Sequence, residues 1–182
     1  MEILVRYRRT RRLSMRIGKN GDVHVSAPIG MPGKEVERFI EQHRDWITEA
    51  RRKTAERTTQ RDRFYNQLLL TTKAQKLEAC NRVRALVEPM VAQHAAAMGV
   101  KPTAVSFKPM ISRWGVCHVA RHSICYSTYL LLLPEWCVEH VVVHELCHIR
   151  HHDHSPAFYA LLASVLPDHR ERRKLLRMPR EE

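Results

Sequence analysis

Residues 141–155 read VVVHELCHIRHHDHS, and this stretch decides both the fold and the chemistry expected of the chain. On an α-helix, residues four apart lie on one face with Cβ atoms about 5–6 Å apart, so His144 and His148 can direct their imidazoles at one point. The apolar run at 141–143 would bury that helix, where unpaired polar side chains are costly. A zinc ion bound by both imidazoles at about 2.0–2.1 Å would satisfy them.

Glu145 is the predicted catalytic residue. It follows His144 directly, so it is badly placed as a ligand in the same plane but well placed to reach a water on the open side of the ion. We expect it to act as a general base that takes a proton from water and passes it to the leaving group. A purely structural zinc site would use four protein ligands and would need no such carboxylate.

His154 is the predicted third ligand. It follows His144 by ten residues, the spacing at which the extended zinc-peptidase pattern places its third histidine after a sharp turn. His151 and His152 are rivals, because either would extend the same face if the helix continued. His154 is preferred because Ser155-Pro156 is typical of a new helix start, which requires the chain to reverse there. The site is thus expected to hold one Zn²⁺ per chain on three ligands: His144, His148 and His154.

Several neighbouring residues have two interpretations. The extended pattern has glycine where this chain has His151, so we expect Asp153 or His152 to make the turn in an unusual backbone conformation. Cys147 either packs toward the core or ligates the metal, and His140 either supports a ligand or fills the core. The candidates for stabilising an oxyanion, each of which could equally be structural, are Arg113, Tyr126 and Tyr129.

The first third of the chain predicts a small antiparallel β unit followed by a helix. Apolar and polar residues alternate within residues 3–27, and the turn sequence GKNGD at 18–22 indicates a hairpin. Helical periodicity follows over 33–57. The polar stretch 58–66 is either a connection or an extension of that helix.

The remainder predicts helices alternating with short strands, and therefore an α+β fold. A helix is expected over 73–98 with Gly99 closing it, and Pro89 should kink that helix or mark its true start. The later elements are strands at 104–108 and 123–133, a helix opened by Pro134, a helix from Pro156 to about Leu166, and a short basic helix after Pro167. The predicted segments are 1–30, 31–72 and 73–182, which together would form one compact domain.

The formal net charge is +12, from 31 Lys and Arg against 19 Asp and Glu. Basic residues gather near both ends and in the middle of the chain. Such a field attracts polyanions and acidic substrates, although solvated helix faces that keep a protein soluble would look the same. No nucleic-acid-binding motif accompanies the charge, so any binding to nucleic acid would be non-specific.

Cysteine usage and hydropathy predict a cytoplasmic protein. The five cysteines are an odd number and contain no Cys-x-x-Cys pair, which is typical of thiols in a reducing compartment. The opening MEILVRYRRTRR lacks the apolar stretch of a signal peptide, and no run approaches the ~20 apolar residues of a membrane span. No membrane partner is therefore expected.

The chain resembles the YgjP-type family of small cytoplasmic zinc metallopeptidases, which are related to SprT-like proteases. The resemblance rests on SRWGVC at 112–117, on 141–155, on Phe158-Tyr159, and on the basic opening RRTRRLSMRI followed by VHVSAP. It implies a zincin-like metallopeptidase domain over 73–182 with the HExxH helix, preceded by a β-rich N-terminal portion. It also implies that His144, His148 and His154 are the ligands and Glu145 the catalytic acid and base.

Some positions depart from the family pattern on the side where substrate is expected. Val116 stands where a small serine is common, and Asp153 stands where asparagine commonly precedes the third histidine. Ser127 and Tyr129 stand where the family tends to show asparagine and arginine. The metal site is unaffected by these changes. Two further residues could either line the cleft or be structural: Arg113 and Trp114.

The leading functional hypothesis is a zinc-dependent peptidase that acts on protein or peptide substrates. The motif alone also allows a zinc-dependent hydrolase of nucleotide phosphoanhydrides, because a metal-activated water can attack phosphorus as well as carbon. A third hypothesis joins the protease to the basic surface as a nucleic-acid-associated enzyme.

Overall fold

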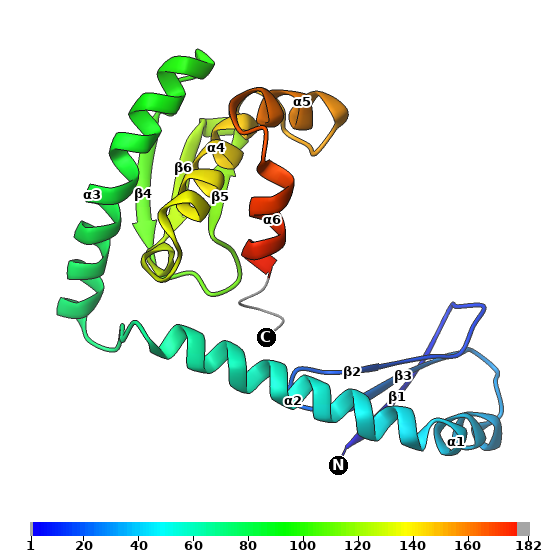
Figure 1. Ribbon diagram of the computed structural model, residues 1–182. Coiled ribbons are helices and arrows are strands. Elements are labelled where there is room, and N and C mark those ends of the chain that lie inside the picture. The colour runs from blue at the N-terminus through cyan, green and yellow to red at the C-terminus, as the bar shows by residue number, and fades with distance from the viewer. Residues whose placement is uncertain (1, 178–182) are drawn as a thin grey trace. The chain divides into compact units, whose positions relative to one another are not determined.

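The computed structural model describes residues 2–177, which form two compact units (Figure 1). The boundary between the units falls between Asp62 and Arg63, inside helix α2 (Arg44–Asn66). The fold is α+β, as predicted, and each unit has its own three-stranded sheet. The predicted division of the chain stays a prediction, with segments 1–30, 31–72 and 73–182.

The N-terminal unit is built on strand β3 (Val23–Pro28), which lies between β1 (Ile3–Arg8) and β2 (Ser14–Ile17). Its alternating pattern buries Val23, Val25 and Ala27, which join Val36 and Ile47 of the neighbouring helices in a small core. The β2–β3 hairpin is antiparallel, as predicted, and it turns through Gly18 and Gly21.

Strand β1 departs from the predicted antiparallel arrangement of residues 3–27, because it runs parallel to β3. The β unit is therefore mixed. The reason is that β3 carries the most deeply buried face of the unit and so takes the central position, with a partner on each side. Strands β1 and β2 run in opposite directions, as two consecutive strands of an antiparallel sheet would. They do not pair with each other, because β3 lies between them.

The helix predicted over 33–57 is two helices. Helix α1 (Gly33–Gln42) ends at His43, whose Nδ1–H donates to the carbonyl oxygen of Phe39 at 2.7 Å. Helix α2 then runs from Arg44 to Asn66, so residues 58–66 extend a helix instead of forming a connection. The break was not visible in the sequence, because the apolar periodicity continues through it.

The C-terminal unit begins its sequence of elements with α3 (Lys73–Met98), which has the predicted bounds. Thr72 and Gln75 form a reciprocal capping box at its start, and Gly99 ends it in the left-handed conformation. Pro89 lies inside the helix, so the alternative that it marks the true start is wrong. Its missing N–H removes one hydrogen bond from the helix without ending it.

The sheet of this unit has the order β4 (Ala104–Lys108), β6 (Ser123–Ser127), β5 (Gly115–His118). A short 3₁₀ helix, η1 (Val119–Arg121), joins β5 to β6. The strand predicted over 123–133 is too long, because the chain turns into a second 3₁₀ helix, η2 (Thr128–Leu132). The Ser127 hydroxyl causes the change: it accepts the Tyr129 N–H and donates to the Met110 carbonyl, which ends strand pairing.

Helix α4 (Glu135–Arg150) is the central element of the C-terminal unit, and it packs against α3, β5, α5 and α6 (Figure 1). Val138, Val142 and Leu146 are fully buried along it. Two shorter helices complete the unit, α5 (Pro156–Val165) and α6 (His169–Arg177). Within residues 2–177, none of the helices combines the length and the apolar character that crossing a membrane would require.

Candidate metal centre

Three histidines converge at the C-terminal end of α4. His144 and His148 come from the helix and His154 from the loop before α5, and their ligand nitrogens all lie within 4.8 Å of one another. The Nε2 atoms of His144 and His154 are 3.2 Å apart. Two ligands of a tetrahedral zinc ion, each about 2.0–2.1 Å from the metal, would be separated by about 3.3 Å. The donor set therefore fits a divalent transition metal.

The rings are held in position by the protein around them. The Nδ1–H of His148 donates to the carbonyl oxygen of His151 at 3.0 Å, which leaves Nε2 of His148 to face the cluster. Phe158 is fully buried and contacts all three rings, with centroid distances of 5.0, 4.7 and 4.8 Å to His144, His148 and His154. The sequence had marked Phe158 only as part of a family motif. Its position four residues after His154 was the available signal.

The turn after α4 is made by ordinary backbone geometry, so the expected unusual conformation at His152 or Asp153 is wrong. His151 leaves the helix with extended backbone, φ −123° and ψ 108°. Over residues 2–177, only His122 combines a side chain with positive φ. The Asp153 carboxylate then accepts the Ser155 N–H at 3.3 Å, and this bond replaces the glycine turn of the extended pattern.

The rival ligands lie outside the cluster. His151 contributes its carbonyl oxygen to His148, and the His152 side chain lines the cleft beside the site without joining the three converging rings. Cys147 is fully buried in the core and is not among the converging side chains. His140 is also buried, with its ring stacked at 6.2 Å from His144.

Glu145 points to strand β5. Only 7% of its surface is exposed, and its carboxylate accepts the backbone N–H of Cys117. Gly115 lies directly beneath it: a Cβ at that position would be 2.6 Å from Cγ and 2.8 Å from Oε1 of Glu145. Sequence reasoning missed both β5 residues, although SRWGVC had been recognised as a motif. Of that motif it had weighed Arg113 and Trp114 as cleft residues and Val116 as a departure from the family pattern.

Burial controls the ionisation of the site. It raises the pKa of Glu145 to about 7, against the opposing effects of the Cys117 N–H and the Arg113 charge. It lowers the pKa of His144 to about 3, helped by His148 and His154. The pKa of His148 is lowered too, again chiefly by burial. The imidazoles of His144 and His148 are therefore neutral, which is the form that binds a metal.

Of the oxyanion candidates, only Arg113 lies at the site. Tyr126 is fully buried, and its hydroxyl donates to the Val142 carbonyl at 3.4 Å. Tyr129 is buried in the core against the Tyr65 ring at 4.7 Å. The Arg113 side chain is exposed and lines the cavities that border Glu145.

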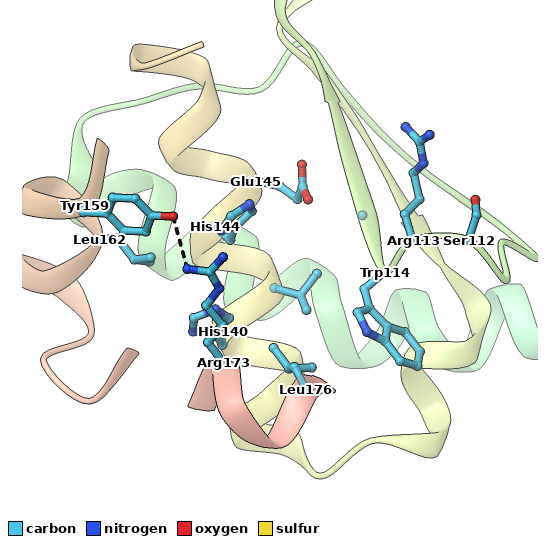
Figure 2. Close-up of a pocket in the computed structure, with 12 residues that line it drawn as sticks. Ser112, Arg113, Trp114, His140, His144, Glu145, Tyr159, Leu162, Arg173 and Leu176 are labelled. Atoms are coloured by element: carbon cyan, nitrogen blue, oxygen red, sulfur yellow. Dashed lines mark hydrogen bonds between the residues drawn. The ribbon is translucent and has the colours of Figure 1, made fainter. Parts of the chain in front are cut away.

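Two cavities share His144 and Glu145 as walls. One, of about 410 Å³, extends along β5 past His148 and His154. The other, of about 270 Å³, lies between α4, α5 and α6 and the 112–115 segment (Figure 2). Trp114 lines the second cavity and also packs 6.2 Å from the ring of Tyr65 in the core, so it combines the two roles that the sequence left open. A metal site with a buried carboxylate and an adjoining cavity is the arrangement of a metallohydrolase.

The comparisons with known proteins assign this class. The sequence matches the profile of the YgjP-like, metallopeptidase domain family over residues 11–80 and 70–178, so the chain belongs to the YgjP-like family. A crystal structure of the metallopeptidase zymogen of Pyrococcus abyssi abylysin aligns with a TM-score of 0.47 and 20% identity, covering 50% of this chain and 92% of its own. Among curated proteins, none matches the chain significantly.

Proposed function

We propose that this metallopeptidase is zinc-dependent and hydrolyses peptide bonds, with the metal on His144, His148 and His154 and with Glu145 as the general base. The observation that carries the proposal is the convergence of three imidazoles, whose ligand nitrogens all lie within 4.8 Å of one another, beside a buried carboxylate. A zinc ion held there would supply Lewis-acid chemistry, polarising the scissile carbonyl and making a water molecule more acidic.

The chain's own residues would supply the proton transfer. Glu145 accepts a proton from the attacking water and returns it to the leaving amine. The Cys117 N–H holds the carboxylate, and Gly115 leaves room for it against β5. Phe158 excludes water from one side of the three rings and fixes their planes. Arg113 is the cationic side chain that can reach a developing oxyanion.

The test is Glu145→Gln, a nearly isosteric change, assayed against unfolded proteins and peptides. We expect the variant to keep its fold and its zinc, measured by elemental analysis, and to retain at most about a hundredth of wild-type activity. Glu135→Gln, at the exposed first turn of the same helix, is the matched control and should be as active as the wild type. Loss of zinc from Glu145→Gln would make Glu145 a ligand, and full activity would overturn the mechanism.

Nucleotides belong in the same assay, because Arg113 and Arg173 line the cavities and guanidinium groups suit phosphates. If the protein cleaves nucleotides and does not cleave peptides, the proposed peptide substrate is wrong and a nucleotide phosphoanhydride takes its place.

We further propose that the exposed basic residues of the N-terminal unit bind polyanions without reading sequence. In the part of the chain that the structure describes, none of this group has a carboxylate within ion-pair distance: Arg6, Arg8, Arg9, Arg11, Arg12 and Arg16. We also propose a cytoplasmic location, which the five unpaired cysteines support.

A further inference from the structure

We propose that the 270 Å³ cavity beside the metal centre binds a carboxylate of the substrate next to the scissile bond, with Arg173 as its cationic partner. This inference rests on the proposed peptidase function and names its substrate class. The cavity opens on His144 and Glu145, so a group bound in it lies beside the reacting atoms. It is lined by residues of α4, α5, α6 and the SRWG segment (Figure 2).

The cavity has apolar walls and two arginines: Arg113, whose charge acts on Glu145, and Arg173, which forms a cationic corner with Tyr159. Val141, Leu162, Leu176 and Trp114 form the apolar part. Such walls suit the methylene groups of a side chain or the body of a terminal residue. Glu145 is the one acidic residue on the lining, and its carboxylate is held toward β5. An anion at the opposite, cationic corner would therefore meet little repulsion.

Arg173 supplies that corner, and its guanidinium has donors to spare. Its Nη1 donates to the Tyr159 hydroxyl at 3.2 Å, and its guanidinium lies 5.9 Å from the centre of the same ring. Figure 2 shows the Arg173 side chain reaching between Tyr159 and the histidines of α4. No carboxylate among residues 2–177 lies within ion-pair distance of it. A guanidinium next to an apolar cavity is suited to binding a carboxylate through two parallel hydrogen bonds.

The neighbouring arginine shows the contrast. Arg172 binds Glu139 and Asp168, and it also donates to the Trp136 carbonyl at 2.8 Å. Glu139 in turn pairs with His94 of α3 at 3.1 Å. These bonds fix α6 to α4 and hold Arg173 at the cavity. One arginine of the pair is thus used by the fold, and the other is left for a ligand.

His140 is a buried polar residue in the wall of the same cavity. It is 4% exposed, and its Nδ1 has no hydrogen-bond partner among the described residues. That nitrogen is closed to solvent, so the carboxylate would be held by Arg173 and not by His140.

A carboxylate beside the scissile bond has two sources: an acidic side chain, or the free C-terminus of the substrate. The experiment therefore uses two peptide pairs, one with glutamate or glutamine at the positions flanking the cleaved bond, and one with a terminal acid or amide. We expect the wild type to prefer the carboxylate member of one pair by roughly three- to tenfold in kcat/KM, which is about the net contribution of one hydrogen bond. The pair that shows the preference identifies the source.

Variants at position 173 then test the residue. Arg173→Gln should bring the preference close to one, and Arg173→Lys should keep part of it, because the charge remains without the fork. Arg170→Gln removes an exposed charge from the same helix outside the cavity and should leave the preference at its wild-type value. No preference in the wild type, or an unchanged preference in Arg173→Gln, would overturn the inference.

Binding of the same peptides to the Glu145→Gln protein separates this inference from the proposed function. Tighter binding of the carboxylate peptide, weakened by the added Arg173→Gln change, supports the pocket even where the wild type cleaves nothing. In that case the peptidase function fails and the binding site stands. Equal binding of both members of each pair refutes the pocket, whatever the cleavage assay shows.

Discussion

The two units of this chain have sheets of the same topology and use them for different purposes. In each sheet the third strand in sequence lies between the first, to which it is parallel, and the second, to which it is antiparallel. In the C-terminal unit the hairpin strand β5 carries Gly115 and Cys117 against Glu145. In the N-terminal unit the equivalent strand β2 carries the exposed Arg16 in place of residues that position a buried carboxylate. The topology therefore does not decide the function, and the residues placed on it do.

Burial separates the units in the same way. The C-terminal unit buries a large apolar cluster, and its ionisable site residues lie within or beside that cluster. The N-terminal unit buries a small cluster and keeps its basic side chains in solvent. Removal from water is what changes the chemistry of Glu145, His144 and His148, whereas exposed arginines act at longer range through their summed charge.

The largest expected effect comes from His154→Ala in the C-terminal unit. With two of three ligands left, zinc content measured by elemental analysis should fall far below one per chain, and activity should fall by about 10³-fold or more, because the Lewis acid is lost. His151→Ala and His152→Ala are the controls, and they should keep most of the zinc, since neither ring joins the cluster. Equal losses in all three variants would refute the ligand assignment.

A smaller effect is expected from the glycine that supports Glu145. Gly115→Ala would place a methyl group 2.6 Å from Cγ of Glu145, so the carboxylate must move. We expect kcat to fall about 10- to 100-fold with zinc retained, because a shift of about 1 Å in a catalytic group has that cost. Gly33→Ala in the N-terminal unit is the control, since a Cβ there meets nothing within 4 Å. Unchanged kcat in Gly115→Ala would show that Glu145 does not depend on the fit against β5.

Local signals in the sequence predicted much of this structure. The capping residues and periodicity of α3 gave its bounds, and the histidine spacing brought three side chains to one point. Contacts between distant segments were not predictable in this way. The parallel pairing of β1, the break at His43 and the fit of Gly115 against Glu145 each depend on a partner elsewhere in the fold. The departure of Ser127 from strand geometry likewise depends on Met110, on another segment.

The smallest expected effect concerns the charge of the N-terminal unit. If its exposed arginines bind phosphates, log affinity for duplex DNA should fall linearly with log salt concentration, with a slope near −0.9 for each phosphate contacted. Replacing Arg9, Arg11 and Arg12 together by glutamine should therefore make the slope shallower by up to about three.

The matched control removes the same charge from the other unit, at three exposed positions of its first helix and with the same substitution: Lys73, Lys76 and Arg82. Fluorescence anisotropy at several salt concentrations measures both slopes. A slope that changes only in the N-terminal variant localises the contact to that unit, because a lost phosphate contact removes a released counterion while a distant charge changes only the long-range field. Equal small changes in both variants would mean that the +12 charge acts as a diffuse field, and the absence of any binding at low salt would mean that it only keeps the protein soluble.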